Sequence, residues 1–150
     1  MIRIVIADDQ RMFLGALSTL LELEEDMQVV GKAKNGEEAL VLVKQFAPDV
    51  CIMDMEMPLK SGLDVAEDLK NESCKLIILT TFARPGYFER ARDAGVSGYL
   101  LKDRPSEELV NSIRFIFEGQ RIYAQELVDM VIETNESPLF KREEVLNLSS

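Results

Sequence analysis

The sequence predicts an α/β fold in which a five-stranded parallel sheet, in the strand order 2-1-3-4-5, carries helices on both faces. Short apolar runs alternate five times with stretches of helical period over about the first 120 residues. Within this pattern residues 50–53 are all apolar, which is typical of a strand buried on both faces. Parallel strands need right-handed crossover connections, and the stretches of helical period can supply them.

The predicted strands are apolar runs bounded by turn residues or charged residues. The second run alternates as an edge strand does, and Asn35-Gly36 marks a turn after it. The third run ends at Asp54, shortly before the helix-incompatible Pro58. In chain order the predicted strands are Ile2–Ala7, Gln28–Ala33, Val50–Met53, Lys75–Thr80 and Gly98–Lys102.

The predicted helices carry apolar residues at helical spacing between start and stop signals. Pro48 follows the second helix, Ser61-Gly62 precedes the third, and Pro105 opens the fifth. Acidic residues follow Pro105, where the positive end of the helix dipole favours them. The predicted helices span about residues 10–24, 37–46, 63–70, 86–94 and 105–118.

The length and composition predict one domain with an appendage. At 150 residues and 47% hydrophobic composition, the chain can bury one core of ordinary size. We predict that residues 1–120 form this domain and residues 121–138 a helical linker. Apolar spacing from Leu127 to Ile132 predicts that a helix covers Gln120–Thr134. Residues 139–150 are too few to fold alone.

The composition also restricts the partners and the compartment. The chain carries 17 basic and 27 acidic side chains, and its net charge of −10 is the wrong sign for a surface that binds nucleic acid phosphates. The first apolar run, residues 2–7, is too short for a signal peptide or a membrane span. We therefore expect a cytoplasmic protein without membrane insertion that does not bind DNA through this chain.

Polar residues stand at the ends of four predicted strands. Because the carboxyl ends of parallel strands meet at one edge of the sheet, these residues should converge there. In the flavodoxin-like strand order, strands one and three are neighbours, which would bring Asp8, Asp9 and Asp54 close together. The converging residues are Asp8, Asp9, Asp54, Glu56, Thr80, Thr81 and Lys102.

Three adjacent carboxylates repel one another. Two carboxylates about 4 Å apart repel by roughly 4 kcal/mol at an effective dielectric constant of about 20, so the cluster needs a cation or raised pKa values. Mg²⁺ fits best, because it binds through one or two carboxylates, retains waters and is completed by phosphate oxygens. Lys102 and Thr80 would then bind phosphoryl oxygens, and Asp54 would be the nucleophile that becomes an aspartyl-phosphate.

Each of these residues alone has an ordinary structural explanation. An Asp pair after a strand often caps a helix, a Thr at a strand end reflects strand propensity, and a single Lys is usually solvated. Their joint occurrence at the ends of four strands nevertheless indicates a site.

These residues, together with Met57-Pro58, Gly62, Ala94-Gly95 and Tyr99, resemble the receiver domain of two-component response regulators over about residues 1–120. The stretch Leu139–Leu146 resembles the start of the helix-turn-helix DNA-binding domain of the NarL/LuxR class. It departs from that class at Phe140, where Thr is usual, and has one residue fewer between two acidic positions. Residues 139–150 would be a truncated start of that domain, so DNA binding would belong to a C-terminal domain that is missing from this chain.

The resemblance implies that a sensor histidine kinase transfers a phosphoryl group to Asp54. It makes Asp9 a direct Mg²⁺ ligand, Asp8 a water-mediated one, and the backbone carbonyl of Glu56 a further ligand. The implied domain is no enzyme beyond Mg²⁺-dependent self-phosphorylation and dephosphorylation. It switches conformation and dimerisation to control transcription through an attached DNA-binding domain. The implied phosphate contacts are Thr80 and Lys102, and the implied switch residues are Thr80 and Tyr99.

Two alternatives remain open. A haloacid-dehalogenase-like phosphohydrolase also uses an Asp nucleophile, Mg²⁺, Thr and Lys, with a second acid where Glu56 stands, but in the reverse order along the chain. A degenerate receiver that only binds proteins would not need the acidic trio, Thr80 and Lys102. Steady turnover of a phosphomonoester would support the first alternative, and failure to bind Mg²⁺ the second.

The first and fifth predicted helices carry more apolar residues than one buried stripe needs. Three residues suffice on each helix, centred on Leu17 and Ile113. The surplus would form an exposed patch through which the chain forms a homodimer on phosphorylation. A deeper core, or contacts with the linker helix, would explain the surplus equally simply. The surplus residues are Leu14, Leu21, Val110, Phe115 and Phe117.

Overall fold

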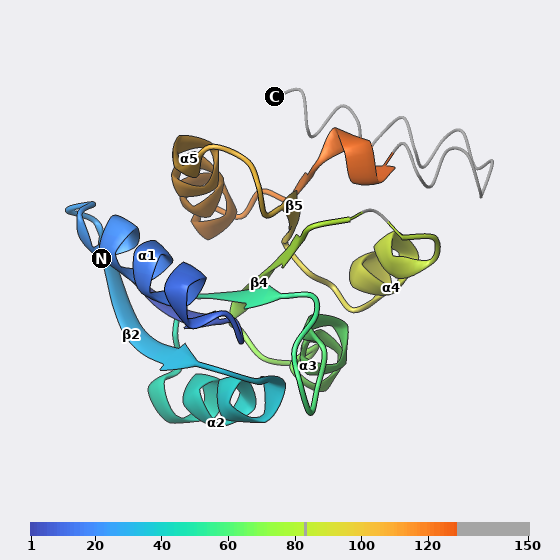
Figure 1. The fold of residues 1–150 in the computed structure, drawn as a ribbon, viewed down its shortest axis with the longest axis horizontal. Coiled ribbons are helices and arrows are strands. Elements are labelled where there is room, and N and C mark those ends of the chain that lie inside the picture. Colours follow the sequence, from blue (N-terminus) through green and yellow to red (C-terminus); the bar gives the residue numbers. More distant parts are fainter. Residues whose placement is uncertain (83, 129–150) are drawn as a thin grey trace.

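The computed structural model describes residues 1–82 and 84–128, in which a parallel sheet lies between two layers of helices (Figure 1). The strands are β1 (Ile2–Ala7), β2 (Met27–Ala33), β3 (Val50–Asp54), β4 (Lys75–Thr80), β5 (Gly98–Leu101) and β6 (Ile122–Tyr123). The helices are α1 (Arg11–Glu22), α2 (Gly36–Phe46), α3 (Gly62–Asp68), α4 (Tyr87–Asp93) and α5 (Ser106–Phe117).

The sheet has the strand order β2-β1-β3-β4-β5-β6, and neighbouring strands are parallel. The predicted order of the first five strands is confirmed. All five residues of β3 are buried, as the uninterrupted apolar run predicts.

The sixth strand was not predicted. Ile122 and Tyr123 pair with Gly98 and Tyr99 of β5, so the prediction of a helix from Gln120 is wrong at its start. Helical conformation begins at residue 125 and continues to residue 128, the last residue that the structure describes. Without β6, the edge of β5 would expose unpaired backbone groups beside apolar side chains. The rest of the predicted linker and residues 139–150 lie outside the described residues.

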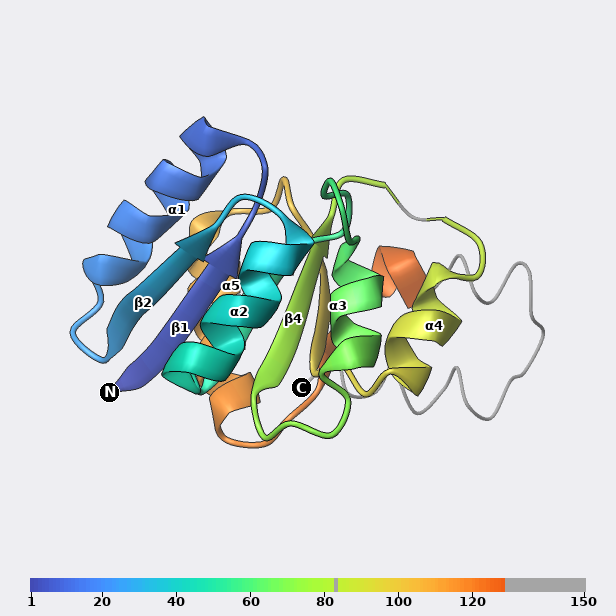
Figure 2. The same cartoon turned by 90° about the horizontal axis from the view of Figure 1, so that it is seen from below.

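Each face of the sheet has its own helical layer. Helices α1 and α5 cover one face, and α2, α3 and α4 cover the other (Figure 2). The sheet therefore separates two apolar cores, and residues that alternate along a central strand reach one core or the other. In the described part of the chain, none of the helices has the length and hydrophobicity that crossing a bilayer requires.

The buried face of α1 differs from the predicted one. Leu14, Leu17 and Leu21 are buried, whereas Phe13 and Leu20 are only half-buried. The assignment of Leu14 and Leu21 to an exposed surplus is therefore wrong. Adjacent rows on a helix can both be apolar and can share a residue, so periodicity alone does not decide which row meets the sheet.

The same correction applies to Val110 of α5, which is buried in the core that α1 and α5 share. The deeper-core explanation accounts for these residues. Phe115 and Phe117 are the members of the predicted surplus that remain exposed, at 42% each.

Matched leucine substitutions test the corrected face of α1. Leu21 is fully buried, whereas Leu23, just past the helix, is 77% exposed. Leu21→Ala should lower the free energy of unfolding by about 2–5 kcal/mol, because it leaves a cavity in the core. Leu23→Ala should change it by less than about 0.5 kcal/mol. Urea unfolding would measure both, and equal losses would contradict the assigned face.

Candidate functional site

Four strands deliver polar side chains to one edge of the sheet. Strand β1 ends just before Asp8, β3 ends at Asp54, β4 ends at Thr80 and β5 ends just before Lys102. Ala7 pairs with Met53 across β1 and β3, so the acidic residues that follow them on the two strands are neighbours. The predicted convergence therefore depends on the adjacency of β1 and β3 in the sheet.

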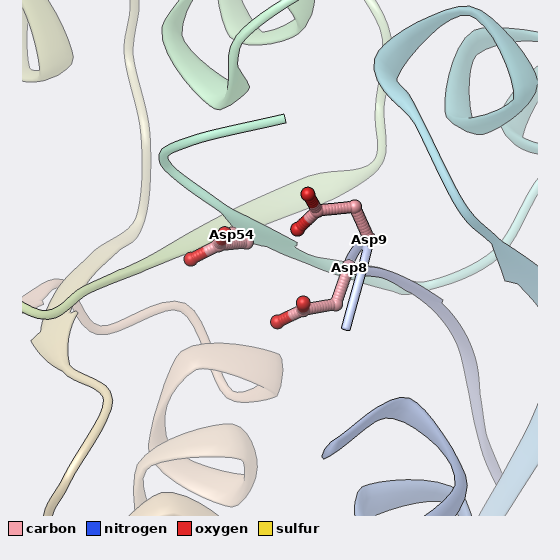
Figure 3. A group of neighbouring side chains, drawn as sticks. All are labelled: Asp8, Asp9 and Asp54. Atoms are coloured by element: carbon pink, nitrogen blue, oxygen red, sulfur yellow. The ribbon is translucent and has the colours of Figure 1, made fainter. Parts of the chain in front are cut away.

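Three carboxylates gather at this edge. Oxygen atoms of Asp8, Asp9 and Asp54 lie within 4.8 Å of one another. Asp8 and Asp54 are 2% and 6% exposed, and Asp9 is exposed. Figure 3 shows all three carboxylates on the same side of the strand ends. Two of the charges are thus held largely away from water, where repulsion is screened least.

Burial and neighbouring charge shift the acidity of Asp54. Loss of hydration and the nearby Asp8 carboxylate raise the pKa of Asp54 to about 6, although Lys102 acts in the opposite direction. The anionic form that a nucleophile needs is therefore destabilised unless more positive charge is present.

Lys102 supplies part of that charge. Its ammonium nitrogen lies 2.8 Å from an oxygen of Asp8 and 3.6 Å from one of Asp54. It also donates a hydrogen bond of 2.8 Å to the side-chain carbonyl of Gln10 and lies 4.4 Å from the centre of the Phe13 ring. The ammonium thus contacts two of the three carboxylates and is fixed from the side of α1.

Gln10 and Phe13 are contacts that sequence reasoning missed. Gln10 begins the predicted helix, and Phe13 was assigned to the apolar stripe of that helix, so nothing in the local pattern pointed to a contact with Lys102. Their contact with Lys102 spans about 90 residues of sequence and arises only when α1 and β5 pack on the same sheet. The position of Gln10 directly after the Asp pair was the available signal.

Thr80 is buried at the predicted edge, but its hydroxyl points into its own loop. The hydroxyl donates a hydrogen bond of 2.9 Å to the backbone carbonyl of Phe82. Contact with a phosphoryl group on Asp54 would require this bond to break. Thr81, which follows, is exposed.

Glu56 does not join the acidic group with its side chain. Its carboxylate is exposed and lies 3.3 Å from a guanidinium nitrogen of Arg84. The proposed ligand at this position is the backbone carbonyl, and that assignment stays a prediction. Tyr99, the predicted switch residue, is buried on β5 beside Phe88 of α4.

The backbone around Asp54 explains one glycine of the motif. A Cβ atom on Gly62 would lie 2.6 Å from the backbone oxygen of Asp54. The amide of Gly62 also donates to the carbonyl of Met55 at 3.0 Å, which draws the start of α3 against the end of β3. A larger residue at this position would push the loop away from the site.

The group of donors suits a divalent cation. Three carboxylates carry more negative charge than Lys102 can balance, and carboxylate oxygens are the ligands that hard cations prefer. Asp8, Asp9 and Asp54 could therefore hold a metal ion.

Comparison with known proteins settles the family. Residues 4–114 match the response regulator receiver domain. The chain belongs to the response regulator receiver family. This match covers most of the chain, confirms the resemblance seen in the motifs and favours a receiver domain over the phosphohydrolase alternative.

Individual relatives agree with this assignment. The chain is 63% identical over 150 residues to the transcriptional regulatory protein DesR of Bacillus subtilis, covering 99% of this chain and 74% of DesR. It is 56% identical over 153 residues to the transcriptional regulatory protein YvfU of the same organism, covering 100% of this chain and 76% of YvfU. A crystal structure of a LuxR-family DNA-binding response regulator from Staphylococcus aureus matches with a TM-score of 0.75 and 39% identity, covering 78% of this chain and 99% of that chain.

The raised pKa of Asp54 predicts how the stability of the receiver depends on pH without metal. The pKa is about 6 in the folded protein and 3.8 in the reference state, so between these values the folded form retains a proton that the unfolded form loses. Stability should therefore fall as the pH rises through this window. Asp54→Asn cannot ionise and should be more stable than the parent by about 2 kcal/mol at pH 7.5, with the difference shrinking towards pH 4.

Urea unfolding in a chelating buffer at several pH values would measure this difference. Glu25→Gln, which removes an exposed carboxylate, is the control and should follow the parent. If the unfolding free energies of the parent and Asp54→Asn change with pH in parallel, the pKa of Asp54 is not raised.

Proposed function

We propose that this receiver is a phosphorylation switch in which Asp54 accepts a phosphoryl group from a sensor histidine kinase. The observation that supports this most directly is the position of Asp54 at the end of a buried strand, with its carboxylate among Asp8, Asp9 and Lys102. Burial and the neighbouring carboxylate of Asp8 raise the pKa of Asp54, and a bound cation would favour its anionic form.

Mg²⁺ is the metal that we propose for the site. Asp9 and Asp54 would bind it directly, Asp8 would bind it through water, and the backbone carbonyl of Glu56 would complete the protein ligands. When bound, the ion would neutralise carboxylate charge and orient phosphoryl oxygens. The carboxylate geometry supports a hard divalent cation in general, and the choice of Mg²⁺ rests on its preference for few carboxylates together with phosphate.

The chain's own residues account for the transfer. A carboxylate oxygen of Asp54 would attack the phosphorus, forming an O–P bond while the N–P bond to the kinase histidine breaks and its electron pair returns to the imidazole. Lys102, now 3.6 Å from Asp54, would bind one of the phosphoryl oxygens. Thr80 would turn from the carbonyl of Phe82 to donate to another. Beyond self-phosphorylation and self-dephosphorylation, we propose no separate enzymatic turnover.

The consequence of phosphorylation would be a change in Thr80 and Tyr99 and control of transcription. A dianion on Asp54 binds the Thr80 hydroxyl in one orientation only, so it shifts the equilibrium between two arrangements. DesR and YvfU are named transcriptional regulatory proteins, and we extend that role to this receiver through an attached DNA-binding domain in the cytoplasm.

Intact mass spectrometry would test the phospho-acceptor. Incubation with acetyl phosphate and Mg²⁺ should add one phosphoryl group to the parent protein, and chelation of the metal should prevent it. Asp54→Asn should gain none, because the amide cannot act as the nucleophile. Glu56→Gln is the matched control and should still be modified, since its carboxylate pairs with Arg84 outside the cluster. Modification of Asp54→Asn would refute the assignment.

Phosphorylation would also promote a homodimer through α1 and α5. These helices border a groove of about 500 Å³. Its apolar lining includes the half-buried Phe13, Leu20 and Leu109 and the exposed Phe115. Lys102 of the phosphorylation site lines the same groove, so the surface and the site share a residue. Exposed apolar surface of this kind often marks a partner site.

Substitutions for this surface must spare the core. Leu14 and Val110 are buried, so charged residues there would unfold the protein rather than test the dimer. Phe115→Glu places a charge on the exposed surface of α5 instead.

Light scattering with Mg²⁺ and beryllofluoride, a phosphoryl mimic, should show the parent shifting from monomer towards dimer. Phe115→Glu should remain monomeric, because dimerisation would bury its charge. Val41→Glu on α2, 62% exposed on the other side of the sheet, is the control and should dimerise as the parent does. If Phe115→Glu dimerises normally, the surface lies elsewhere.

A further inference from the structure

The aromatic ring of Phe13 faces the ammonium group of Lys102 at the edge of the site. The Lys102 nitrogen lies 4.4 Å from the centre of the ring, which is within the range of a cation–π interaction. The Lys102 side chain is only 10% exposed, so water screens this attraction little. The ring thus attracts the cation without adding another full negative charge to the carboxylate cluster.

Packing of α1 holds the Phe13 ring in this place. Phe13 is half-buried and packs on the core that α1 and α5 share. Its neighbour Leu14 is buried in that core, and the Leu14 amide donates to the Gln10 carbonyl at 2.9 Å. The ring is therefore anchored by hydrophobic contacts that do not depend on the charges of the site.

The polar contacts of Lys102 depend on the site itself. An ammonium has three N–H donors, and an oxygen of Asp8 and the side-chain carbonyl of Gln10 each lie 2.8 Å from it. An oxygen of Asp54 lies at 3.6 Å. Asp8 and Asp54 belong to the cluster that could hold a metal, so a bound cation would compete with Lys102 for their oxygens. The Phe13 ring would not take part in that competition, and its attraction for the ammonium would remain.

The contact with the ring also leaves the ammonium free to move. A hydrogen bond requires a defined direction, whereas the face of a ring attracts a cation anywhere within about 6 Å of its centre. Lys102 could therefore shift towards a phosphoryl oxygen on Asp54 while it stays over Phe13. The ring would restrict the position of the ammonium without occupying an N–H group that the phosphoryl oxygen needs.

We propose that Phe13 is a positioning residue, which keeps the Lys102 ammonium beside Asp54 when ligands occupy the site. An arriving phosphoryl group would then meet a cation that is already in place. This inference rests on the proposed function, because it concerns the residue that would bind a phosphoryl oxygen. It gives an apolar side chain a role in that chemistry, although the side chain does not touch the reacting atoms.

Fluorinated phenylalanines at position 13 of the intact chain would test the interaction. Fluorine withdraws electron density from the face of the ring with little change in size, so the attraction for a cation falls with each substitution. Mono-, di- and trifluorophenylalanine should progressively weaken the binding of beryllofluoride in the presence of Mg²⁺. The trifluorinated ring should weaken it about threefold or more. Amide NMR titrations would measure the affinity, at protein concentrations where light scattering shows a monomer.

Phe46, half-buried at the end of α2 on the other side of the sheet, is the matched control. The same fluorinated series at Phe46 should leave the affinity for beryllofluoride unchanged. If the parent binds beryllofluoride and the Phe13 series shows no trend, the inference is overturned and the proposed function stands. If the parent does not bind beryllofluoride, both are overturned.

Two ordinary substitutions separate positioning from a structural role. Phe13→Leu retains an apolar side chain without a ring and should bind beryllofluoride about threefold more weakly or worse, whereas Phe13→Tyr retains the ring and should bind as the parent does. Neither should weaken the binding of Mg²⁺ alone, because β1 and β3 position Asp8 and Asp54. A parallel loss of Mg²⁺ affinity in Phe13→Leu would indicate a disturbed cluster and overturn the positioning role, as would parent-like binding of beryllofluoride.

NMR of the Lys102 side chain would test the contact without metal or beryllofluoride. Protons over the face of a ring are shielded, so the methylene group next to the Lys102 ammonium should resonate upfield of an exposed lysine in the parent. Phe13→Tyr should retain this shift, and Phe13→Leu should lose it. A Lys102 resonance that does not respond to Phe13→Leu would overturn the inference.

Discussion

The approach of Asp8 and Asp54 at adjacent strand ends is the constraint on which the rest of the site depends. Two nearly buried carboxylates with a third beside them are unfavourable in a metal-free protein, and the raised pKa of Asp54 reflects this. The fold accepts the repulsion because β1 and β3 are adjacent interior strands, whose apolar residues pack on both faces. Hydrophobic burial thus holds these charges together at a place where a bound cation could neutralise them.

Two side chains at this site contact different parts of the molecule. Lys102 contacts both Asp8 and the start of α1, through Gln10 and Phe13, so its position bears on the face formed by α1 and α5. Thr80 contacts the loop before α4, so its position bears on the opposite face. A small change at one sheet edge can therefore reach both helical layers, because packed elements move as units rather than deforming gradually.

Sequence patterns predicted the features that follow from local chemistry and from the convergence of the carboxyl ends of parallel strands at one edge of the sheet. The uninterrupted run of β3, the strand order and the convergence of Asp8, Asp54 and Lys102 follow from these rules. What they could not predict depends on tertiary alignment. Leu14 and Phe13 are both apolar and adjacent, and only the placement of α1 on the sheet buries one and leaves the other partly exposed. Likewise, Ile122 and Tyr123 form a strand because they pair with the edge of β5. The periodicity of residues 120–134 carries no information about that edge.

The corrected faces of α1 and α5 separate residues that stabilise the core from residues on the exposed surface. Leu14, Leu21 and Val110 stabilise the shared core, so a change there acts on folding. Phe115 and Phe117 retain exposed surface, at 42% each, so a change there acts mainly on the surface of α5. The groove next to α1 and α5 is lined in part by Lys102, which also forms an ion pair with Asp54. A change of charge at Asp54 would therefore act on a residue of this groove. Phe115 lines the groove that Lys102 also lines, so the homodimer that we propose would bury a surface adjoining the Asp54 site.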